Sequence, residues 1–120
     1  PYSHGFVLCG SMFPLSGVLD PDGNPVWMQR HRNFETSWFV FAPSCDHRAM
    51  RPYGRPITVT GRSGTKQWSE AKHSRRGPDW AGPLLMGMPW ATYDEARLAI
   101  PPDYTEWIGG RLRELLERAA

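Results

Sequence analysis

The fold of this chain depends on residues 28–36, which read MQRHRNFET. Aromatic and β-branched residues flank this stretch on both sides, a composition typical of strands, and we expect one long or bent strand over residues 26–41. Side chains two residues apart on a strand point to the same face, so Arg30 and Arg32 would hold two guanidinium groups side by side. Such a pair suits the clamping of a phosphate or a base oxygen. The alternative is an exposed strand face that pairs with acidic neighbours.

Shorter strand and turn signals lie on either side of this stretch. Residues 6–9 (FVLC) form an apolar run that ends at Gly10, which predicts a buried strand followed by a turn or a short helical piece. Residues 21–25 (PDGNP) are a dense turn signal that we expect to cap a hairpin. Residues 56–60 (PITVT) predict a further strand, and residues 61–82 show no sustained period, which indicates a loop.

The last third of the chain has a helical pattern. Thr92 precedes Glu95 by three residues, the spacing of a capping box, which predicts a helix that runs to about Ala99. The prolines at 101–102 end that helix, and a second helix is expected from about Asp103. One face of this second helix carries Tyr104, Trp107, Ile108, Leu112, Leu115 and Leu116. We interpret the leucines of that face as core packing.

Length and composition are those of one folded globular domain. The chain has 120 residues, of which 40% are hydrophobic and 22% are charged, enough for one compact core and too few for two. No apolar run approaches the roughly 18 to 20 residues of a membrane helix, which favours a protein that does not enter a membrane. The two cysteines, Cys9 and Cys45, are too few for a disulfide scaffold, and we expect both to be reduced.

Basic residues are concentrated in one part of the chain. Residues 47–76 hold eight arginines and lysines and one glutamate, a local charge of +7, whereas the whole chain carries +2. Interleaved glycines, serines and a tryptophan give this segment the composition of a loop that lies along phosphates. A solvated surface loop is the equally weighted alternative.

Motifs for self-contained metal or nucleotide chemistry do not occur in the sequence. It has neither a phosphate-binding glycine loop nor a CxxC pair or an HExxH motif. A four-ligand site around Cys45 and His47 would need further ligands to converge on them, and the candidates are His4, Cys9, His31 and His73. We therefore predict no metal site and interpret Cys9 as a small core residue.

A series of sequence blocks covers nearly the whole chain. The blocks are residues 7–13 (VLCGSMF), 30–36 (RHRNFET), 43–47 (PSCDH), 86–90 (MGMPW) with Glu95, and 99–109 (AIPPDYTEWIG). In sequence and in order they resemble the C-terminal part of phage-type DNA cytosine-5 methyltransferases. The last block is similar to the closing motif of those enzymes.

The resemblance implies an α/β fold, the C-terminal portion of a Rossmann-like methyltransferase, with a few strands, a basic loop region and two C-terminal helices. The chain would form a single unit over residues 1–120. Residues 1–60 would supply strands of the methyltransferase sheet, residues 61–82 a short target-recognition region, and residues 83–120 the C-terminal helical motif.

The chemistry that the resemblance implies is cytosine methylation. A cytosine is flipped out of the DNA helix, attacked by a cysteine and methylated at carbon 5 by S-adenosylmethionine. The family's Pro-Cys motif with the nucleophile, its Glu-Asn-Val motif and its glycine-rich cofactor motif do not occur in this sequence, and we expect all three to precede Pro1. By itself the chain would be inactive, and it would bind S-adenosylmethionine only together with that N-terminal half.

The resemblance also implies roles for individual residues. Arg30 and Arg32 match the family's paired arginines, which hold the target cytosine and its phosphate. Tyr104, Thr105 and Glu106 match the final motif, which packs beside the cofactor pocket. The candidates for contacts to double-stranded DNA within the basic segment are Arg62, Lys66, Trp68, Arg75 and Arg76.

We therefore predict the C-terminal, DNA-recognition part of such a transferase, in the cytoplasm of a bacterial host cell, with a complementary N-terminal half as a partner. A strand edge left unpaired without that half would favour self-association. Two alternatives stay open: a non-catalytic DNA-binding remnant, and a small zinc-stabilised structural protein without a role at DNA.

Overall fold

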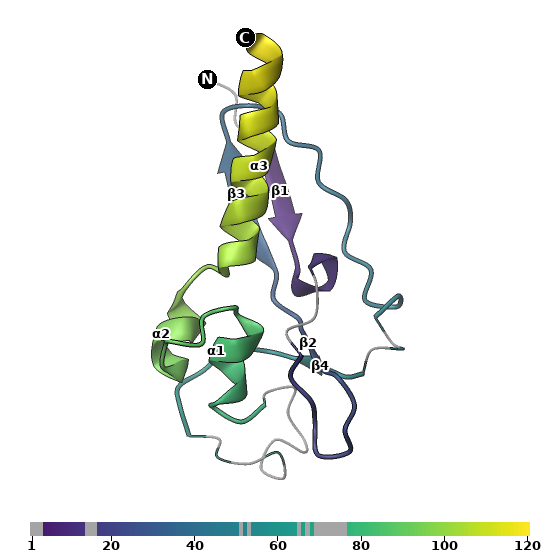
Figure 1. Cartoon of the computed structure of the whole chain (residues 1–120), viewed down its shortest axis with the longest axis vertical. Helices are drawn as coiled ribbons and strands as arrows, with labels where there is room; N and C mark the ends of the chain where they lie inside the picture. The colour runs from purple at the N-terminus through teal and green to yellow at the C-terminus, as the bar shows by residue number, and fades with distance from the viewer. Residues whose placement is uncertain are drawn as a thin grey trace.

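The computed structural model describes residues 4–13, 17–50, 52, 54–64, 66, 68 and 77–120. Its elements follow in the order β1 (His4–Leu8), the 3-10 turn η1 (Gly10–Met12), β2 (Trp27–Met28), β3 (Arg32–Thr36), β4 (Pro56–Ile57), α1 (Ala81–Leu85), α2 (Tyr93–Leu98) and α3 (Pro102–Ala119). In Figure 1, α3 runs alongside β1 and β3, and α1, α2, β2 and β4 lie beyond its N-terminal end. The fold is a small mixed α/β arrangement, and its relation to a Rossmann-like sheet stays a prediction.

The part of the molecule beside α3 is an antiparallel ladder. β1 and β3 pair with Phe6 opposite Phe34 and Leu8 opposite Arg32, and η1 follows β1 directly, so the strand and the short helical piece predicted there are confirmed. The rings of Phe6 and Phe34 stack with centroids 5.7 Å apart, and Phe6 lies 6.1 Å from the ring of Trp107 on α3. These aromatic contacts hold α3 against the ladder.

β2 and β4 form a separate, parallel pair of two residues each. The segments can approach because residue 54 is glycine: its φ is +101°, and a Cβ there would collide with the Pro25 carbonyl. The indole N–H of Trp27 donates to the Gly54 carbonyl at 3.3 Å. The predicted turn before β2 is confirmed by the antiparallel bridge between Leu19 and Pro25 that closes it.

The one continuous strand expected over residues 26–41 is wrong. Residues 29–31 separate β2 from β3, and the chain leaves the ladder after Thr36. The break lies where Arg30 enters the interior and its carbonyl accepts a hydrogen bond from a side chain on α3 instead of from a strand. β4 is likewise shorter than the five-residue strand expected there.

The helices confirm the predicted boundaries and add one element. The capping box is present, since the Thr92 hydroxyl accepts from the Glu95 N–H and the Glu95 carboxylate accepts from the Thr92 N–H. α3 begins at Pro102, one residue earlier than expected. α1 was not predicted, because its five residues, AGPLL, are too few to show a helical period.

The C-terminal half of α3 projects from the molecule. Trp107 and Ile108 pack against the core, but Leu115 and Leu116 are exposed, so the predicted core packing is wrong for these two leucines. The molecule measures 52 × 29 × 22 Å, and its solvent-accessible surface is 7856 Å². A compact protein of this mass exposes about 6,600 Å². The chain thus leaves more surface uncovered than an ordinary monomer does.

Within the described part of the chain, no helix has the length and apolar character required to cross a bilayer.

A buried arginine joins the ladder to the end that carries α1 and α2. The Arg30 guanidinium donates hydrogen bonds to the backbone carbonyls of Val59, of Arg97 at 2.7 Å and of Ala99 at 3.1 Å. The Tyr104 hydroxyl, on α3, donates to the Arg30 carbonyl at 2.6 Å. Arg30 is 3% exposed and Tyr104 is fully buried. Three segments that are distant in sequence, at residues 30, 59 and 97–104, are tied together at this one residue.

Replacing Arg30 with Ala should strongly destabilise the fold. Three backbone carbonyls would lose a charged donor, and hydrogen bonds to charged groups contribute about 1.5–3 kcal/mol each. We expect the free energy of unfolding, measured by urea denaturation, to fall by at least about 3 kcal/mol. Arg32→Ala, which removes a half-buried guanidinium, should change it by about 0.5 kcal/mol or less. Equal losses in the two variants would contradict the anchoring role of Arg30.

Candidate functional site

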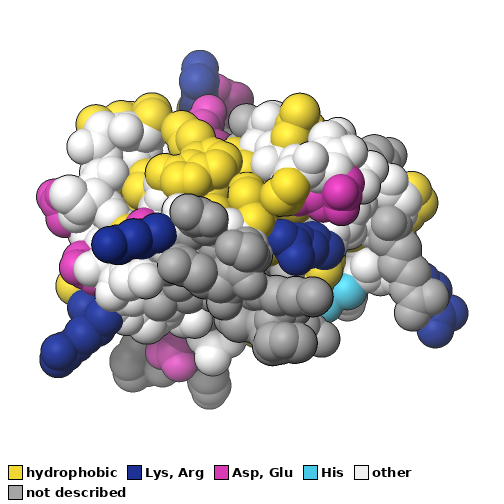
Figure 2. All heavy atoms as spheres, turned by 90° about the horizontal axis from the view of Figure 1, so that it is seen from below, with side chains coloured by type: hydrophobic (Ala, Val, Ile, Leu, Met, Phe, Trp, Pro, Cys, Tyr) yellow, Lys and Arg dark blue, Asp and Glu magenta, His cyan; other side chains and the backbone are white. Residues whose placement is uncertain are grey.

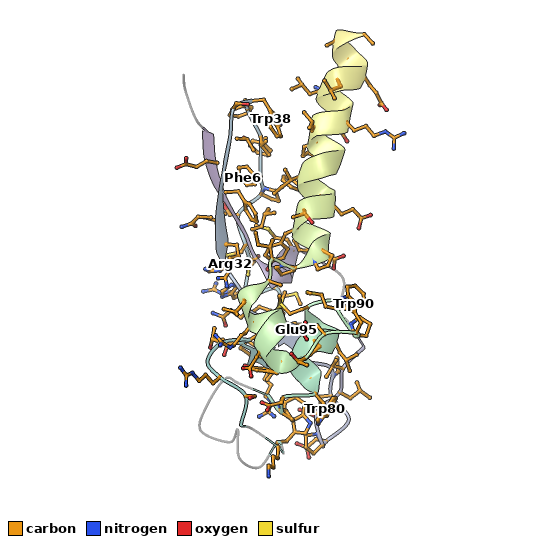
Figure 3. The ribbon with its side chains drawn as sticks, turned by 90° about the vertical axis from the view of Figure 1, so that its left-hand side faces the viewer. Phe6, Arg32, Trp38, Trp80, Trp90 and Glu95 are labelled. Atoms are coloured by element: carbon orange, nitrogen blue, oxygen red, sulfur yellow. The ribbon has the colours of Figure 1, made fainter. Side chains whose placement is uncertain are left out.

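The two arginines of the predicted clamp have different surroundings. The two terminal nitrogens of the Arg30 guanidinium donate to backbone carbonyls, and burial, followed by the nearby charge of Arg32, lowers the pKa of Arg30 to about 10. Arg30 therefore keeps its proton at neutral pH. Arg32 lies at the end of the ladder toward α2 (Figure 3), and its guanidinium donates to the His31 carbonyl at 3.0 Å. Arg30 thus has a structural role here, and the contact with a target phosphate stays a prediction that Arg32 is better placed to meet.

The predicted cofactor residues lie at the start of α3. Tyr104 is fully buried, its ring stacks on Phe13 with centroids 5.0 Å apart, and burial raises the pKa of its hydroxyl. The Thr105 hydroxyl donates to the Pro102 carbonyl at 3.0 Å, and both Thr105 and Glu106 are exposed. Tyr104 therefore serves the core, whereas Thr105 and Glu106 can face a cofactor. That cofactor contact stays a prediction.

The predicted DNA-contacting residues fall into three groups. Arg75 and Arg76 lie outside the described residues. Arg62 and Lys66 are exposed on the segment that follows β4. Trp68 is half-buried against the core, where its ring meets that of Trp80 edge to face with centroids 6.1 Å apart. Arg62 and Lys66 are accordingly the described candidates for phosphate contacts, while Trp68 has a packing role.

Two carboxylates hold the basic segment at Ser63 and Gly64. Asp94, in the first turn of α2, accepts hydrogen bonds from the Ser63 N–H at 2.9 Å and the Ser63 hydroxyl at 3.0 Å. Asp79 accepts from the Gly64 N–H at 2.8 Å. The bonds from Ser63 are the main cause that holds the pKa of Asp94 below its usual value. The loop that carries Arg62 is therefore attached to the α1–α2 end of the molecule at two points.

Figure 2 views this end of the molecule from below. Lys and Arg side chains stand at separate points around a group of apolar side chains. Trp80, labelled at this end in Figure 3, and Leu84 are both exposed and line a shallow pocket beside Tyr93. Among the described residues, the Lys and Arg side chains on this face are separated by apolar side chains and do not form one continuous basic strip.

The structure also brings together four side chains that are far apart in the sequence. Each contributes one ligand atom, and these atoms all lie within 4.8 Å of one another; the residues are Cys9, His31, Cys45 and His47, named here the Cys/His cluster. The Nε2 atoms of the two histidines are 3.2 Å apart. Cys9 Sγ lies 3.3 Å from His47 Nε2, and Cys45 Sγ lies 3.4 Å from His31 Nε2. A metal site at Cys45 and His47 required two further ligands nearby, and the structure places Cys9 and His31 there.

The Cys45 thiol of the Cys/His cluster is not activated as a nucleophile. Burial, followed by the proximity of Cys9, raises the pKa of the Cys45 thiol, and a reactive cysteine needs the opposite shift. The arrangement suits ligation better than nucleophilic catalysis. Sequence reasoning missed the convergence because it left Cys9 and His31 unpaired. The signal that could have revealed it was the pairing of β1 with β3, because Cys9 and His31 adjoin its last pair, Leu8 and Arg32.

Comparisons of this chain with protein-family models, curated proteins and solved structures find no match. The resemblance carried by the sequence blocks therefore stays a proposal, and its support must come from the geometry.

Acid should remove the stabilising effect of Asp94. Its pKa is lowered in the folded chain, so its contribution is present above the unfolded value of about 4 and is lost as the pH falls through the folded value. We expect Asp94→Asn to melt below the parent chain near neutral pH, and the difference to shrink as the pH falls below the unfolded value and Asp94 takes up its proton. Glu106→Gln, which removes an exposed carboxylate from α3, is the control for loss of one charge. A melting difference for Asp94→Asn that is independent of pH would contradict this account.

Proposed function

We propose that this chain is the C-terminal, DNA-recognition part of a DNA cytosine-5 methyltransferase, which transfers a methyl group from S-adenosylmethionine to cytosine. The observation that carries the proposal is a contact between two blocks of the resemblance. Arg30, from residues 30–36, and Tyr104, from residues 99–109, are hydrogen-bonded across 74 positions of sequence. Blocks that belong to one enzyme are expected to meet in the fold, whereas a chance similarity in two unrelated segments would not require them to do so.

The chemistry is divided between this chain and a partner. Without the Pro-Cys and Glu-Asn-Val motifs, the chain by itself transfers no methyl group, and S-adenosylmethionine binds only once a complementary N-terminal half completes the site. In that complete enzyme, Arg32 contacts the target nucleotide, and Thr105 and Glu106 lie beside the cofactor. The working location is the cytoplasm of a bacterial host cell.

The contribution of this chain is to hold double-stranded DNA. Arg62 and Lys66 are exposed on a segment that Asp94 and Asp79 attach to the molecule. A loop fixed before binding loses less conformational entropy when it meets phosphates than a free loop does. Phosphate contacts of this kind position DNA without reading its sequence.

Binding of this chain to double-stranded DNA should weaken steeply as salt is added. Each phosphate contact contributes about 0.9 to the slope of log affinity against log salt concentration. Arg62→Ala/Lys66→Ala, and separately Arg75→Ala/Arg76→Ala, should lower both the affinity and this slope, which fluorescence anisotropy over a salt series measures. The matched control is Arg113→Ala/Arg118→Ala, which removes the same charge from the projecting end of α3.

A folded chain that leaves DNA unbound at low salt would overturn the proposal and favour the structural alternative. Equal losses of affinity in the control and the two test variants would also count against it, because net charge alone would then explain binding.

The uncovered surface supports a protein partner as well. Phe39 and Phe41 are 71% and 78% exposed, and they line a groove with Leu115 and Arg118 of α3. Exposed apolar patches of this kind mark interaction surfaces. We propose that the N-terminal half covers this groove in the complete enzyme. In its absence a second copy of the chain binds here or along the edges of the β1–β3 ladder, which no other described strand covers.

The isolated chain should therefore self-associate. Sedimentation velocity over a concentration series should show a dimer whose fraction rises with concentration, because apolar burial favours association. Phe41→Lys should shift this equilibrium toward monomer, since a charge enters the groove. Leu98→Lys, at an equally exposed apolar position on α2, should leave it unchanged. Monomer at every concentration would refute self-association.

A further inference from the structure

The ligand atoms of the Cys/His cluster lie at the spacing of a tetrahedral metal shell. Bonds of about 2.3 Å to sulfur and about 2.0–2.1 Å to nitrogen set neighbouring ligand atoms about 3.3–3.8 Å apart in a tetrahedron. Separations of 3.2, 3.3 and 3.4 Å are at or close to this range, and all separations in the cluster stay within 4.8 Å. Small side-chain movements would therefore complete the shell.

The strand ladder holds two of the four ligands in place. β1 and β3 are in a register that pairs Leu8 with Arg32. Cys9 directly follows Leu8 and His31 directly precedes Arg32, so both ligands lie just beyond the last pair of the ladder. Cys9 is also buried where the chain enters η1. The ladder thus brings together the two segments that carry these ligands.

The other two ligands are two residues apart, with His47 at the start of a turn and Cys45 just before it. The Asp46 carboxylate accepts a hydrogen bond from the Ala49 N–H at 3.0 Å, and a further backbone bond to the His47 carbonyl closes the turn. The His47 ring also lies 5.2 Å from the ring of Trp27. These contacts hold Cys45 and His47 against the end of the ladder.

We propose that the Cys/His cluster binds one Zn²⁺ ion as a closed structural site. Two sulfurs and two imidazole nitrogens suit Zn²⁺, whereas Mg²⁺ and Ca²⁺ take oxygen ligands. Four protein ligands complete a tetrahedron and leave no position for substrate or a catalytic water. As the ion binds, each thiol forms a bond through its sulfur and releases its proton to solvent. This inference does not depend on a role at DNA.

The ion would fasten a segment that otherwise has little regular structure. After Thr36 the chain forms no described strand or helix before β4, and Phe39 and Phe41 on this segment are exposed. Zn²⁺ would link Cys45 and His47 on this segment to Cys9 and His31 beside the ladder. The ion would thereby fix the segment between Thr36 and Cys45 at both of its ends. A small domain with limited core gains much from such a cross-link.

The first test is metal content. The chain, purified under reducing conditions, loaded with Zn²⁺ and dialysed, should retain one zinc per chain by inductively coupled plasma mass spectrometry. Cys45→Ser and His47→Gln should each lose the bound zinc. His4→Gln should retain it, because His4 pairs with Thr36 at the far end of the ladder.

The second test uses the unaltered chain and so does not depend on whether a variant folds. Co²⁺ in place of Zn²⁺ should give the intense visible bands of a tetrahedral site together with a thiolate charge-transfer band. Zn²⁺ should also slow tryptic cleavage after the exposed Arg48 by at least about tenfold relative to a chelated sample, because the loop opens less often.

Three results would overturn the site. One is a chain, folded by circular dichroism, whose two thiols stay fully reactive in excess Zn²⁺. Another is a Co²⁺ spectrum of octahedral type. The third is a Cys9–Cys45 disulfide that forms again after the reductant is removed even in the presence of excess Zn²⁺, which would show that the two sulfurs approach each other for a different reason.

Discussion

The structure depends on the buried guanidinium of Arg30. A charge removed from water is costly unless acceptors replace the lost solvent, and here backbone carbonyls from two separate segments supply them. The planar fork of arginine can meet several carbonyls at once, which a lysine ammonium cannot do in the same way. Within the described residues Arg30 Nε has no acceptor, so the compensation is incomplete. The importance of Arg30 therefore lies in fixing β4, α2 and α3 relative to one another. The strength of any single hydrogen bond matters less.

Local signals predicted the local structure, and distant contacts decided the rest. The capping box at Thr92 and the turn at residues 21–25 rest on interactions within a few residues, so the sequence was sufficient for both. The break at residues 29–31 has a cause 29 to 74 positions away, in the partners of Arg30. Strand alternation cannot foresee such a contact. The exposed Leu115 and Leu116 were missed for a related reason, because an amphipathic face shows what a helix can bury and not what is present to cover it.

The candidate sites divide in the same way. The basic segment was visible in composition, and Arg62 and Lys66 are exposed as phosphate contacts require, but composition could not tell that Trp68 would pack against Trp80. The Cys/His cluster was harder to predict. Its sequence pattern is a bare CxH at 45–47, and its other two members become neighbours only when β1 and β3 pair in the observed register. Pairing strands before searching for ligands would have found it.

Three consecutive residues of the stretch MQRHRNFET thus have three different structural roles. Arg30 reaches the core and anchors the fold, His31 belongs to the Cys/His cluster, and Arg32 begins β3 with a half-buried guanidinium. Successive side chains of an extended segment point to opposite sides, so neighbours in sequence can serve opposite surroundings. The break in the strand is what makes this division possible, since an unbroken ladder would have kept Arg30 beside a strand instead of inside the core. In a methyltransferase of the proposed kind, one short segment would then stabilise the domain and present an arginine to the target nucleotide.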